Sequence, residues 1–140
     1  MKIHAYLIFD GNCAEAFTFY AQCLGGAASI MPVSENAECA GMFPADQHHR
    51  TLHACLTLGD QLLMGSDTLG DQPYDGIKGC HVSIQVGSIA EAERVFAALS
   101  AGGEVQMALE KTFWAVRFGM LKDRFGVPWM INCEADNASA

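Results

Sequence analysis

Three histidines stand in stretches where apolar and polar residues alternate, and histidine is well suited to proton transfer or metal binding near neutral pH. They are His4, His53 and His81. Side chains on a strand point alternately to opposite faces, so each histidine is predicted to lie on the face away from its apolar neighbours. His53 is therefore a candidate acid/base group, and the alternative interpretation is a hydrogen-bonded core histidine.

An aromatic cluster late in the chain provides a second set of candidate site residues. Trp114 and Phe118 share one face of a predicted strand, where they are expected either to pack in the core or to wall an apolar pocket. Arg117 points to the opposite face and could bind an anion or pair with Glu110. Glu110 is the acid close to the aromatic residues and is the second candidate for catalysis.

The composition of the 140-residue chain excludes several classes of protein. Hydrophobic residues make up 51% and charged residues 17%, a balance typical of one folded domain and not of a disordered chain. The formal net charge is −8 and no basic run occurs, so neither a nucleic acid nor an anionic membrane surface is an expected partner. No apolar stretch reaches the length of a membrane span.

The spacing of the cysteines and the absence of certain motifs exclude further classes of protein. The six cysteines lie far apart and form no C-x-x-C motif, so they are predicted to be reduced and mostly buried, with the cytosol as the expected compartment. The sequence contains no phosphate-binding loop and no G-x-G-x-x-G motif of the kind that holds nucleotide-like cofactors in doubly wound sheets. An S-adenosylmethionine-dependent methyltransferase is therefore not expected.

The elements that must position these residues occur twice in the sequence. Two segments match without a gap at an offset of 77 residues, His4–Gly26 and His81–Gly103. Each reads as a strand, a short turn, a helix and a closing pair of glycines, and three further predicted strands follow each one. A duplication of this size indicates two βαβββ modules, because one module alone leaves a sheet face uncovered.

The periodicity predicts helices over about 14–24 and 89–101. The predicted strands cover residues 3–9, 27–33, 51–58, 61–66, 81–86, 104–109, 114–122 and 128–133. In the first strand the inward-facing residues are expected to be Ile3, Ala5, Leu7 and Phe9. The polar stretch 34–50 is expected to be a loop that serves as a lid or an interface arm.

These elements predict an α+β fold in which two βαβββ modules form a cupped, mixed and mostly antiparallel sheet with helices on the outer face. Residues 1–134 are expected to make a single domain. Module one is assigned to about residues 1–67, a linker to 68–78 and module two to 79–134. Residues 135–140 are expected to form a flexible tail.

Four groups of residues carry a resemblance to a known family. They are Tyr6-Leu7 with Asp10-Gly11-Asn12 and Phe19-Tyr20; Leu24-Gly25-Gly26; His53-Ala54 with Gly59-Asp60 and Met64-Gly65-Ser66-Asp67; and Thr112-Phe113-Trp114-Ala115 with Phe118-Gly119 and the run from Asp123 to Asn132. On these motifs the sequence resembles the vicinal oxygen chelate superfamily of glyoxalases, bleomycin-resistance proteins and extradiol dioxygenases, and within it the PhnB-like branch. The resemblance covers about residues 1–134 and implies the same two-module fold.

The resemblance also implies a metal site, because metal-dependent members bind a divalent ion with one histidine and one carboxylate from each module. His4 and His81 match the histidine positions, and Zn, Ni, Fe or Mn would be the candidate ions. Met64, or Leu63 in a register shifted by one residue, and Met130 match the carboxylate positions. The sequence therefore predicts an incomplete metal site, with the two methionines as flexible pocket lining.

Together, the residues and the resemblance predict a small-molecule-binding protein with a pocket on the concave sheet face, assembled as a homodimer. The predicted ligand-binding residues are Tyr6, His53, Met64, Ser83, Trp114, Arg117 and Met130. One alternative is a metal-assisted lyase, isomerase or dioxygenase that uses His4 and His81. A second alternative is an interaction scaffold without a small ligand.

Overall fold

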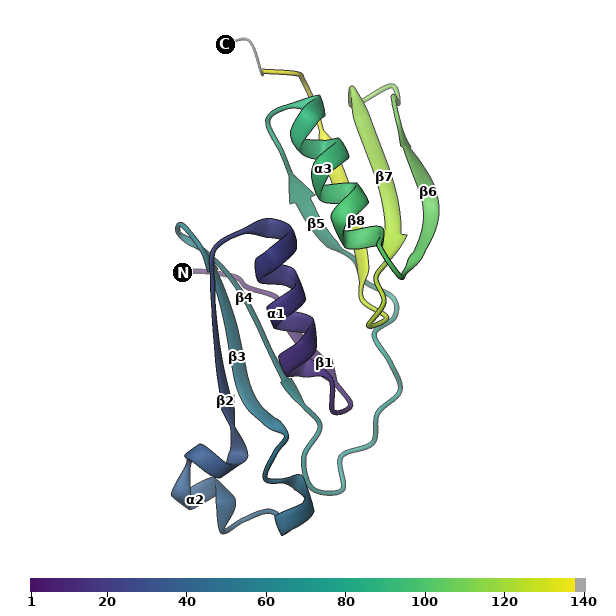
Figure 1. The fold of residues 1–140 in the computed structure, drawn as a ribbon. Coiled ribbons are helices and arrows are strands. Elements are labelled where there is room, and N and C mark those ends of the chain that lie inside the picture. The colour runs from purple at the N-terminus through teal and green to yellow at the C-terminus, as the bar shows by residue number, and fades with distance from the viewer. Residues whose placement is uncertain (138–140) are drawn as a thin grey trace. The chain divides into compact units, whose positions relative to one another are not determined.

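The computed structural model describes residues 1–137 and divides the chain into two compact units, Met1–Gly76 and a second unit that begins at Ile77 (Figure 1). The last three residues of the expected flexible tail, 138–140, lie outside the described residues. Across residues 1–137 no helix has both the length and the apolar character needed to cross a membrane.

The first unit is a four-stranded sheet with one long helix. Its elements are β1 (Tyr6–Phe9), α1 (Cys13–Leu24), β2 (Ala27–Pro32), β3 (Thr51–Leu58) and β4 (Gln61–Asp67). The strand order is β1-β4-β3-β2, in which β1 runs parallel to β4 and the other neighbours are antiparallel. This is the βαβββ topology that the sequence predicts for the first module.

The second unit has the same topology. Its elements are β5 (Val82–Gln85), α3 (Ile89–Ser100), β6 (Glu104–Glu110), β7 (Arg117–Lys122) and β8 (Pro128–Cys133). The strand order is β5-β8-β7-β6, and again only the first pair is parallel. The predicted α+β fold class with two βαβββ modules is therefore confirmed.

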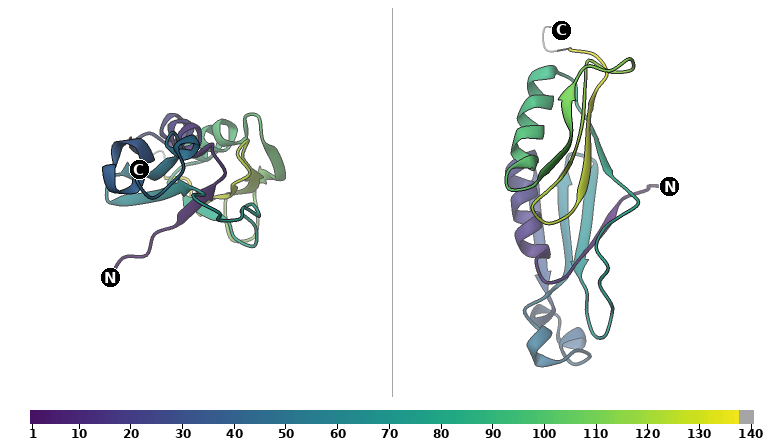
Figure 2. Two further views of the ribbon diagram at one scale, coloured as in Figure 1. Left: turned by 90° about the horizontal axis from the view of Figure 1, so that it is seen from below. Right: turned by 90° about the vertical axis from the view of Figure 1, so that its right-hand side faces the viewer.

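One helix packs against one face of each sheet (Figure 2). A glycine on that face allows the close approach in both units. A Cβ at Gly65 would lie 2.8 Å from the Phe17 ring of α1, and a Cβ at Gly119 would lie 2.7 Å from the Phe96 ring of α3. In the first unit the side chains that fill the layer between helix and sheet are Leu7, Phe9, Ala16, Phe17, Tyr20, Ala54 and Leu56.

The structure corrects two details of the predicted strands. β1 begins only at Tyr6, and Ile3 and Ala5 do not face the core: Ile3 is 90% exposed and Ala5 is also exposed. Alternation over so few residues cannot show whether a partner surface covers them. β7 begins at Arg117 and not at 114, because the Thr112 hydroxyl oxygen accepts hydrogen bonds from the backbone of Trp114 and Ala115 and closes a turn there.

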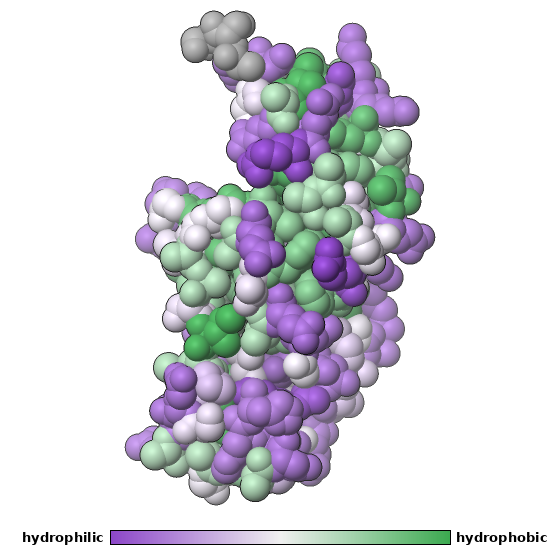
Figure 3. Space-filling view, in the orientation of Figure 1, coloured by the Kyte–Doolittle hydropathy of each residue, from purple (hydrophilic) through white to green (hydrophobic). Residues whose placement is uncertain are grey.

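The predicted polar loop between β2 and β3 contains three short helical segments, η1 (Val33–Glu35), α2 (Ala37–Ala40) and η2 (Ala45–Gln47). Asn36 caps α2 by accepting a 3.0 Å hydrogen bond from the backbone of Cys39. Hydrophilic side chains are abundant on the visible surface around α2 (Figure 3). The segment is thus a structured connection, while its expected role as a lid or interface arm stays a prediction.

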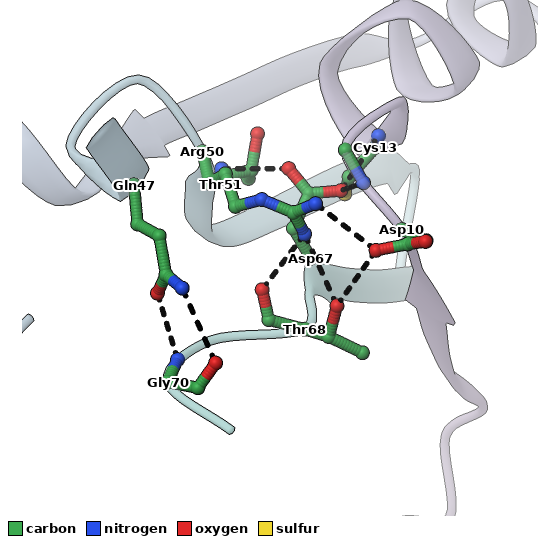
Figure 4. A network of polar contacts seen from close by, with 9 residues as sticks. Asp10, Cys13, Gln47, Arg50, Thr51, Asp67, Thr68 and Gly70 are labelled. Atoms are coloured by element: carbon green, nitrogen blue, oxygen red, sulfur yellow. Dashed lines mark hydrogen bonds and ion pairs between the residues drawn. The ribbon is translucent and has the colours of Figure 1, made fainter. Parts of the chain in front are cut away.

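A buried carboxylate at the end of β4 holds the first unit together at one end (Figure 4). Asp67 is 3% exposed, and one of its oxygens accepts hydrogen bonds from the backbone of Gly11 at 2.8 Å and of Cys13 at 3.1 Å. The other oxygen accepts one from the backbone of Thr51 at 2.8 Å. Asn12 provides no side-chain cap to α1, and Asp67 instead accepts the first backbone N–H of this helix, that of Cys13, from a distant strand.

Next to this carboxylate, Arg50 joins the loop before β3 to the segment after β4 (Figure 4). Its guanidinium donates to the carbonyl oxygen of Thr68 at 3.0 Å, to the Thr68 hydroxyl at 3.1 Å and to Asp10 at 3.0 Å. Hydrogen bonds from Arg50 and then from Thr68 lower the pKa of Asp10. Gln47 adds two hydrogen bonds with the backbone of Gly70, so both loops are tied to each other.

Replacing Asp67 tests the importance of this end of the first unit. Asp67→Ala leaves three backbone N–H groups without their acceptor, and we expect the free energy of unfolding to fall by about 3 kcal/mol. Urea denaturation followed by circular dichroism measures the change. Asp60→Ala, in an exposed hairpin turn, is the matched control and is expected to change stability by less than about 0.5 kcal/mol. Equal stabilities of the two variants would contradict the assigned role.

Candidate functional site

The face of the first sheet opposite α1, here called the first far face, brings together three of the predicted ligand-binding residues. Met64 pairs with Tyr6 on one neighbouring strand and with Cys55 on the other. The Tyr6 hydroxyl lies 3.1 Å from Nδ1 of His53, and the two rings are 5.7 Å apart at an angle of 32°. Tyr6, His53 and Met64 therefore form one cluster, and the interaction with Tyr6 sets the orientation of the imidazole.

His53 is half-buried on this face and is not enclosed in the core. Its neighbours in the chain, Ala54 and Leu56, are the buried residues of β3 on the side of α1. An imidazole that is reachable from solvent and held at one ring nitrogen can bind or transfer a proton through the other. The role of His53 as an acid/base group stays a prediction, now with Tyr6 as its hydrogen-bond partner.

The donor set around His4 does not fit a histidine and carboxylate metal site. His4 precedes β1, and the residue that pairs with the start of this strand is Met64. Asp67 is the nearest acid in β4, but it is buried on the side of α1 and both of its oxygens accept backbone hydrogen bonds. It therefore has no free oxygen to offer an ion on the first far face.

The residues around His81 likewise do not fit a histidine and carboxylate metal site. This residue precedes β5, in which Ser83 pairs with Met130 of β8. Glu134 follows the end of β8 and is exposed. Within residues 1–137 no three histidine, cysteine, aspartate or glutamate side chains are grouped closely enough to hold an ion.

The corresponding face of the second sheet, opposite α3 and here called the second far face, carries a chain of hydrogen bonds. The indole Nε1 of Trp114 donates to Oδ1 of Asn132 at 3.2 Å. Nδ2 of Asn132 donates to Oε1 of Gln85 at 2.8 Å, and Nε2 of Gln85 donates to the Ser83 hydroxyl oxygen at 3.2 Å. The chain connects two predicted ligand-binding residues, Trp114 and Ser83.

Every hydrogen bond in this chain has the same direction, from the indole toward Ser83. Successive amides polarise one another in such an arrangement, so the hydroxyl hydrogen of Ser83 remains as the donor at the end of the chain. Asn132 is only 7% exposed, whereas Ser83 and Gln85 are exposed. The structure thus presents the Ser83 hydroxyl as a hydrogen-bond donor at the surface.

Aromatic rings stand beside the first residue of the hydrogen-bond chain. The Trp114 and Phe118 rings are 5.1 Å apart at 66°, and the Phe113 and Trp114 rings are 4.8 Å apart at 82°. Phe113 is 97% exposed and Trp114 is 45% exposed, so these rings form a surface wall and are not core. Trp114 is therefore not a core residue, while its role as the wall of an apolar pocket stays a prediction.

Arg117 lies on the other side of the second sheet from these residues. Its guanidinium Nε is 3.9 Å from a carboxylate oxygen of Glu93 in α3, and Nη1 donates to the carbonyl oxygen of Val116 at 2.7 Å. The expected ion pair between Arg117 and Glu110 is replaced by this contact with the helix. Glu110 is exposed at the end of β6, where it pairs with Phe118.

A hollow of about 320 Å³ adjoins the second far face. It is lined by Gln85, Val86, Glu134, Ala135 and Asn137. Gln85 belongs both to this hollow and to the hydrogen-bond chain. Neither the hollow nor the roles of Gln85 and Asn132 are among the predictions from the sequence. The signal for Gln85 was its strand alternation with Ser83, and the signal for Asn132 was its place two residues after Met130.

Comparison with known proteins identifies similar chains. The model of the Glyoxalase/Bleomycin resistance protein/Dioxygenase superfamily matches residues 2–131. Protein YjdN of Escherichia coli (strain K12) is 36% identical over 145 residues, with 94% of this chain and 95% of YjdN covered. The match therefore spans nearly the whole of both chains.

Solved structures are similar over almost the whole chain as well. Protein PA1353 from Pseudomonas aeruginosa has a TM-score of 0.90 and 52% sequence identity, covering 97% of this chain and 99% of that one. A PhnB protein from Bacillus cereus, whose description also proposes a 3-demethylubiquinone-9 3-methyltransferase, has a TM-score of 0.75 and 25% identity, covering 95% and 99%.

A more distant likeness concerns the fold alone. The fosfomycin resistance protein FosX from Listeria monocytogenes has a TM-score of 0.62 and 10% identity, covering 94% of this chain and 90% of that one. That structure is a complex with Mn(II) and 1S,2S-dihydroxypropylphosphonic acid. A divalent metal is thus bound by a protein of this fold.

The accessibility of the cysteines gives a test of the described surface. Burial raises the pKa of Cys13 to about 12, and the negative charge of Asp67 raises it as well, against a smaller opposing effect of Thr51. At pH 8 this thiol stays protonated and inaccessible, whereas Cys80 is exposed. We expect a disulfide reagent to modify Cys80 in the native protein and to modify Cys13 only after unfolding.

Peptide mass spectrometry after brief labelling measures this difference. The Cys80→Ser variant is the control, because it should remove the fast labelling of the peptide that contains residue 80. Rapid labelling of Cys13 in the folded protein would contradict the packing of α1 against the first sheet.

Proposed function

Because the chain belongs to the Glyoxalase/Bleomycin resistance protein/Dioxygenase superfamily, we propose that it is a small-molecule-binding protein of that family, with its ligand on the second far face. The residues proposed to contact the ligand there are Ser83, Trp114 and Met130. Tyr6, His53 and Met64 on the first far face are proposed as a second group of binding residues. Arg117 is not included, because its side chain lies against α3.

One observation carries the proposal: the hydrogen-bond chain begins at Trp114, beside the aromatic wall, and ends at the Ser83 hydroxyl, which is a donor. Binding sites for small molecules combine apolar and aromatic surface with a few well-placed polar groups. Asn132 is held at both ends of its amide, by Trp114 and by Gln85. Ser83 would therefore bind a ligand acceptor without first losing side-chain freedom in the groups behind it.

The same features indicate the class of ligand. The aromatic rings favour a planar apolar group, and the Ser83 hydroxyl favours a carbonyl or another neutral acceptor. The formal net charge of −8 disfavours ligands with several negative charges. Met120 pairs with Met130 and with Met107 across three neighbouring strands, and such unbranched side chains adapt to ligands of different shape. We therefore propose neutral aromatic ketones or amides.

The other functions have weaker support. A metal-assisted lyase, isomerase or dioxygenase would use His4 and His81, but Met64 and Met130 stand where acidic ligands would be needed. The methyltransferase named for the Bacillus cereus protein would need a cofactor site, and neither mixed four-stranded sheet offers the glycine-rich turn of a doubly wound fold. A scaffold without a ligand gives no reason for a polarised hydrogen-bond chain at an exposed face.

The experiment is a thermal-shift screen with neutral aromatic ketones and amides, followed by calorimetric titration of the compounds that stabilise the protein. We expect Trp114→Ala to weaken binding by about tenfold or more, because it removes the apolar wall and the first donor of the chain. Ser83→Ala should weaken it about fivefold or more through loss of the terminal hydrogen bond.

Arg117→Gln is the matched control, since Arg117 is in the same unit but on the side of α3, and we expect its affinity to be unchanged. Equal losses in Arg117→Gln and Ser83→Ala would contradict the placement of the ligand. A screen in which no compound raises the melting temperature would argue for the scaffold alternative.

A further inference from the structure

We propose that the first far face contains a binding site for a soft monovalent metal ion, Cu(I), formed by His53, Cys55 and Met64, with Met31 as a fourth donor. None of these residues contributes to the hydrogen-bond chain of the second far face. His53 and Met64 also belong to the second group of proposed small-molecule-binding residues, whereas the ligand site on the second far face uses none of the four metal donors.

Strand register places the four donors on one face. His53 and Cys55 are two residues apart in β3, so their side chains point to the same side of the sheet. Met31 of β2 is the direct cross-strand partner of His53, and Met64 of β4 is the direct partner of Cys55. Direct partners have Cβ atoms about 4.5–5.5 Å apart, and the long thioether side chains can reach an ion above β3.

Burial confirms which side these residues occupy. Ala54 and Leu56 alternate with the two β3 donors and are fully buried on the side of α1. Leu63 is buried, and Gly65 lies against Phe17 of α1, so Met64 between them points away from the helix. Met31 is 42% exposed, which leaves the donors accessible to an ion from solution.

Tyr6 orients the imidazole for coordination. Its hydroxyl is 3.1 Å from Nδ1 of His53. When Nδ1–H donates to the Tyr6 oxygen, the lone pair of Nε2 is free for a metal ion, and this is the tautomer that metal-bound histidines usually have. Tyr6 would thus act as a positioning residue that does not touch the ion.

The types of donor select the ion. The two thioether sulfurs favour Cu(I), whereas Zn is usually bound by thiolate and imidazole ligands and Mn and Mg by oxygen ligands. The first far face presents three sulfur atoms and one imidazole, and its acidic neighbour Asp67 is buried on the other side. Cu(I) would replace the proton of the Cys55 thiol, which is released to solvent, so the ion remains Cu(I) and no oxidant is needed.

Other accessible thiols could bind Cu(I) as well, so an experiment on this site needs a protein without them. Cys13, Cys23 and Cys133 are buried, while Cys39 and Cys80 are more accessible and lie outside the first far face. A protein with Cys39→Ser and Cys80→Ser is therefore the reference. The only described thiol of this protein that is not buried is then Cys55.

The experiment titrates the reference protein with Cu(I) under anaerobic conditions against a chromogenic Cu(I) chelator. We expect one equivalent to bind, and Cys55→Ser to abolish the competition. Met64→Leu and His53→Gln are each expected to weaken binding about tenfold or more, and Tyr6→Phe about tenfold, through loss of a ligand or of its orientation. Met42→Leu, at an exposed methionine in the loop before β3, is the control and should bind like the reference.

Circular dichroism and the melting temperature of each variant are measured without the ion. A loss of folding can therefore be distinguished from a loss of metal binding. Binding that depends on Cys55 but not on His53 or Met64 would mean a simple thiol adduct and would overturn the site. Failure of the reference protein to compete with the chelator, or equally tight competition for Zn(II), would overturn it as well.

Discussion

The packing of one helix on one face of each four-stranded sheet determines which side chains remain for chemistry. Gly65 and Gly119 allow the rings of Phe17 and Phe96 to approach the sheet backbone so closely that a Cβ would collide with them. Because the side chains of a strand point alternately to the two faces of the sheet, the residue next to one that is buried on the helix side points to the opposite face. His53 is thus placed on the first far face by Ala54 and Leu56, and Ser83 on the second by its half-buried neighbours in β5.

The two units have the same topology, but different polar groups cap the first turn of their long helices. In the second unit, Ser88 caps α3 locally by accepting a hydrogen bond from the backbone of Glu91 at 3.1 Å. In the first unit, the cap of α1 comes from Asp67, more than fifty residues away in the chain. Asp123 is a second buried carboxylate, but it supports the β7–β8 turn and the indole of Trp129. Equivalent helices can therefore be anchored by local or by distant groups.

Much of the fold could be predicted from the sequence, because the repeat and the alternation of strand residues can be recognised without knowing which elements contact each other. The offset of 77 residues placed both long helices and most strands, and it put Tyr6 and Ser83 at equivalent positions. Contacts between elements were harder to predict. To predict the ion pair of Arg117 with Glu93, one must know how α3 lies on β7. To predict the hydrogen-bond chain through Asn132, one must know that Trp114 lies in a turn closed by Thr112 and not in a strand. The exposure of Ile3 likewise depends on whether a surface covers it.

The duplicated topology offers two surfaces of different chemistry at matching positions. Tyr6 pairs with Met64 in the first unit, and Ser83 pairs with Met130 in the second, so each first strand lies beside a methionine. What differs is the surrounding side chains: β3 adds an imidazole and a thiol beside Met64, while β8 itself adds Asn132 and the next strand, β7, adds Phe118. A soft, polarisable surface suits an ion such as Cu(I), whereas a preorganised amide beside aromatic rings suits a neutral organic ligand. The core of each unit thus constrains the sheet face that packs on its helix and leaves the opposite face free to differ in side-chain chemistry.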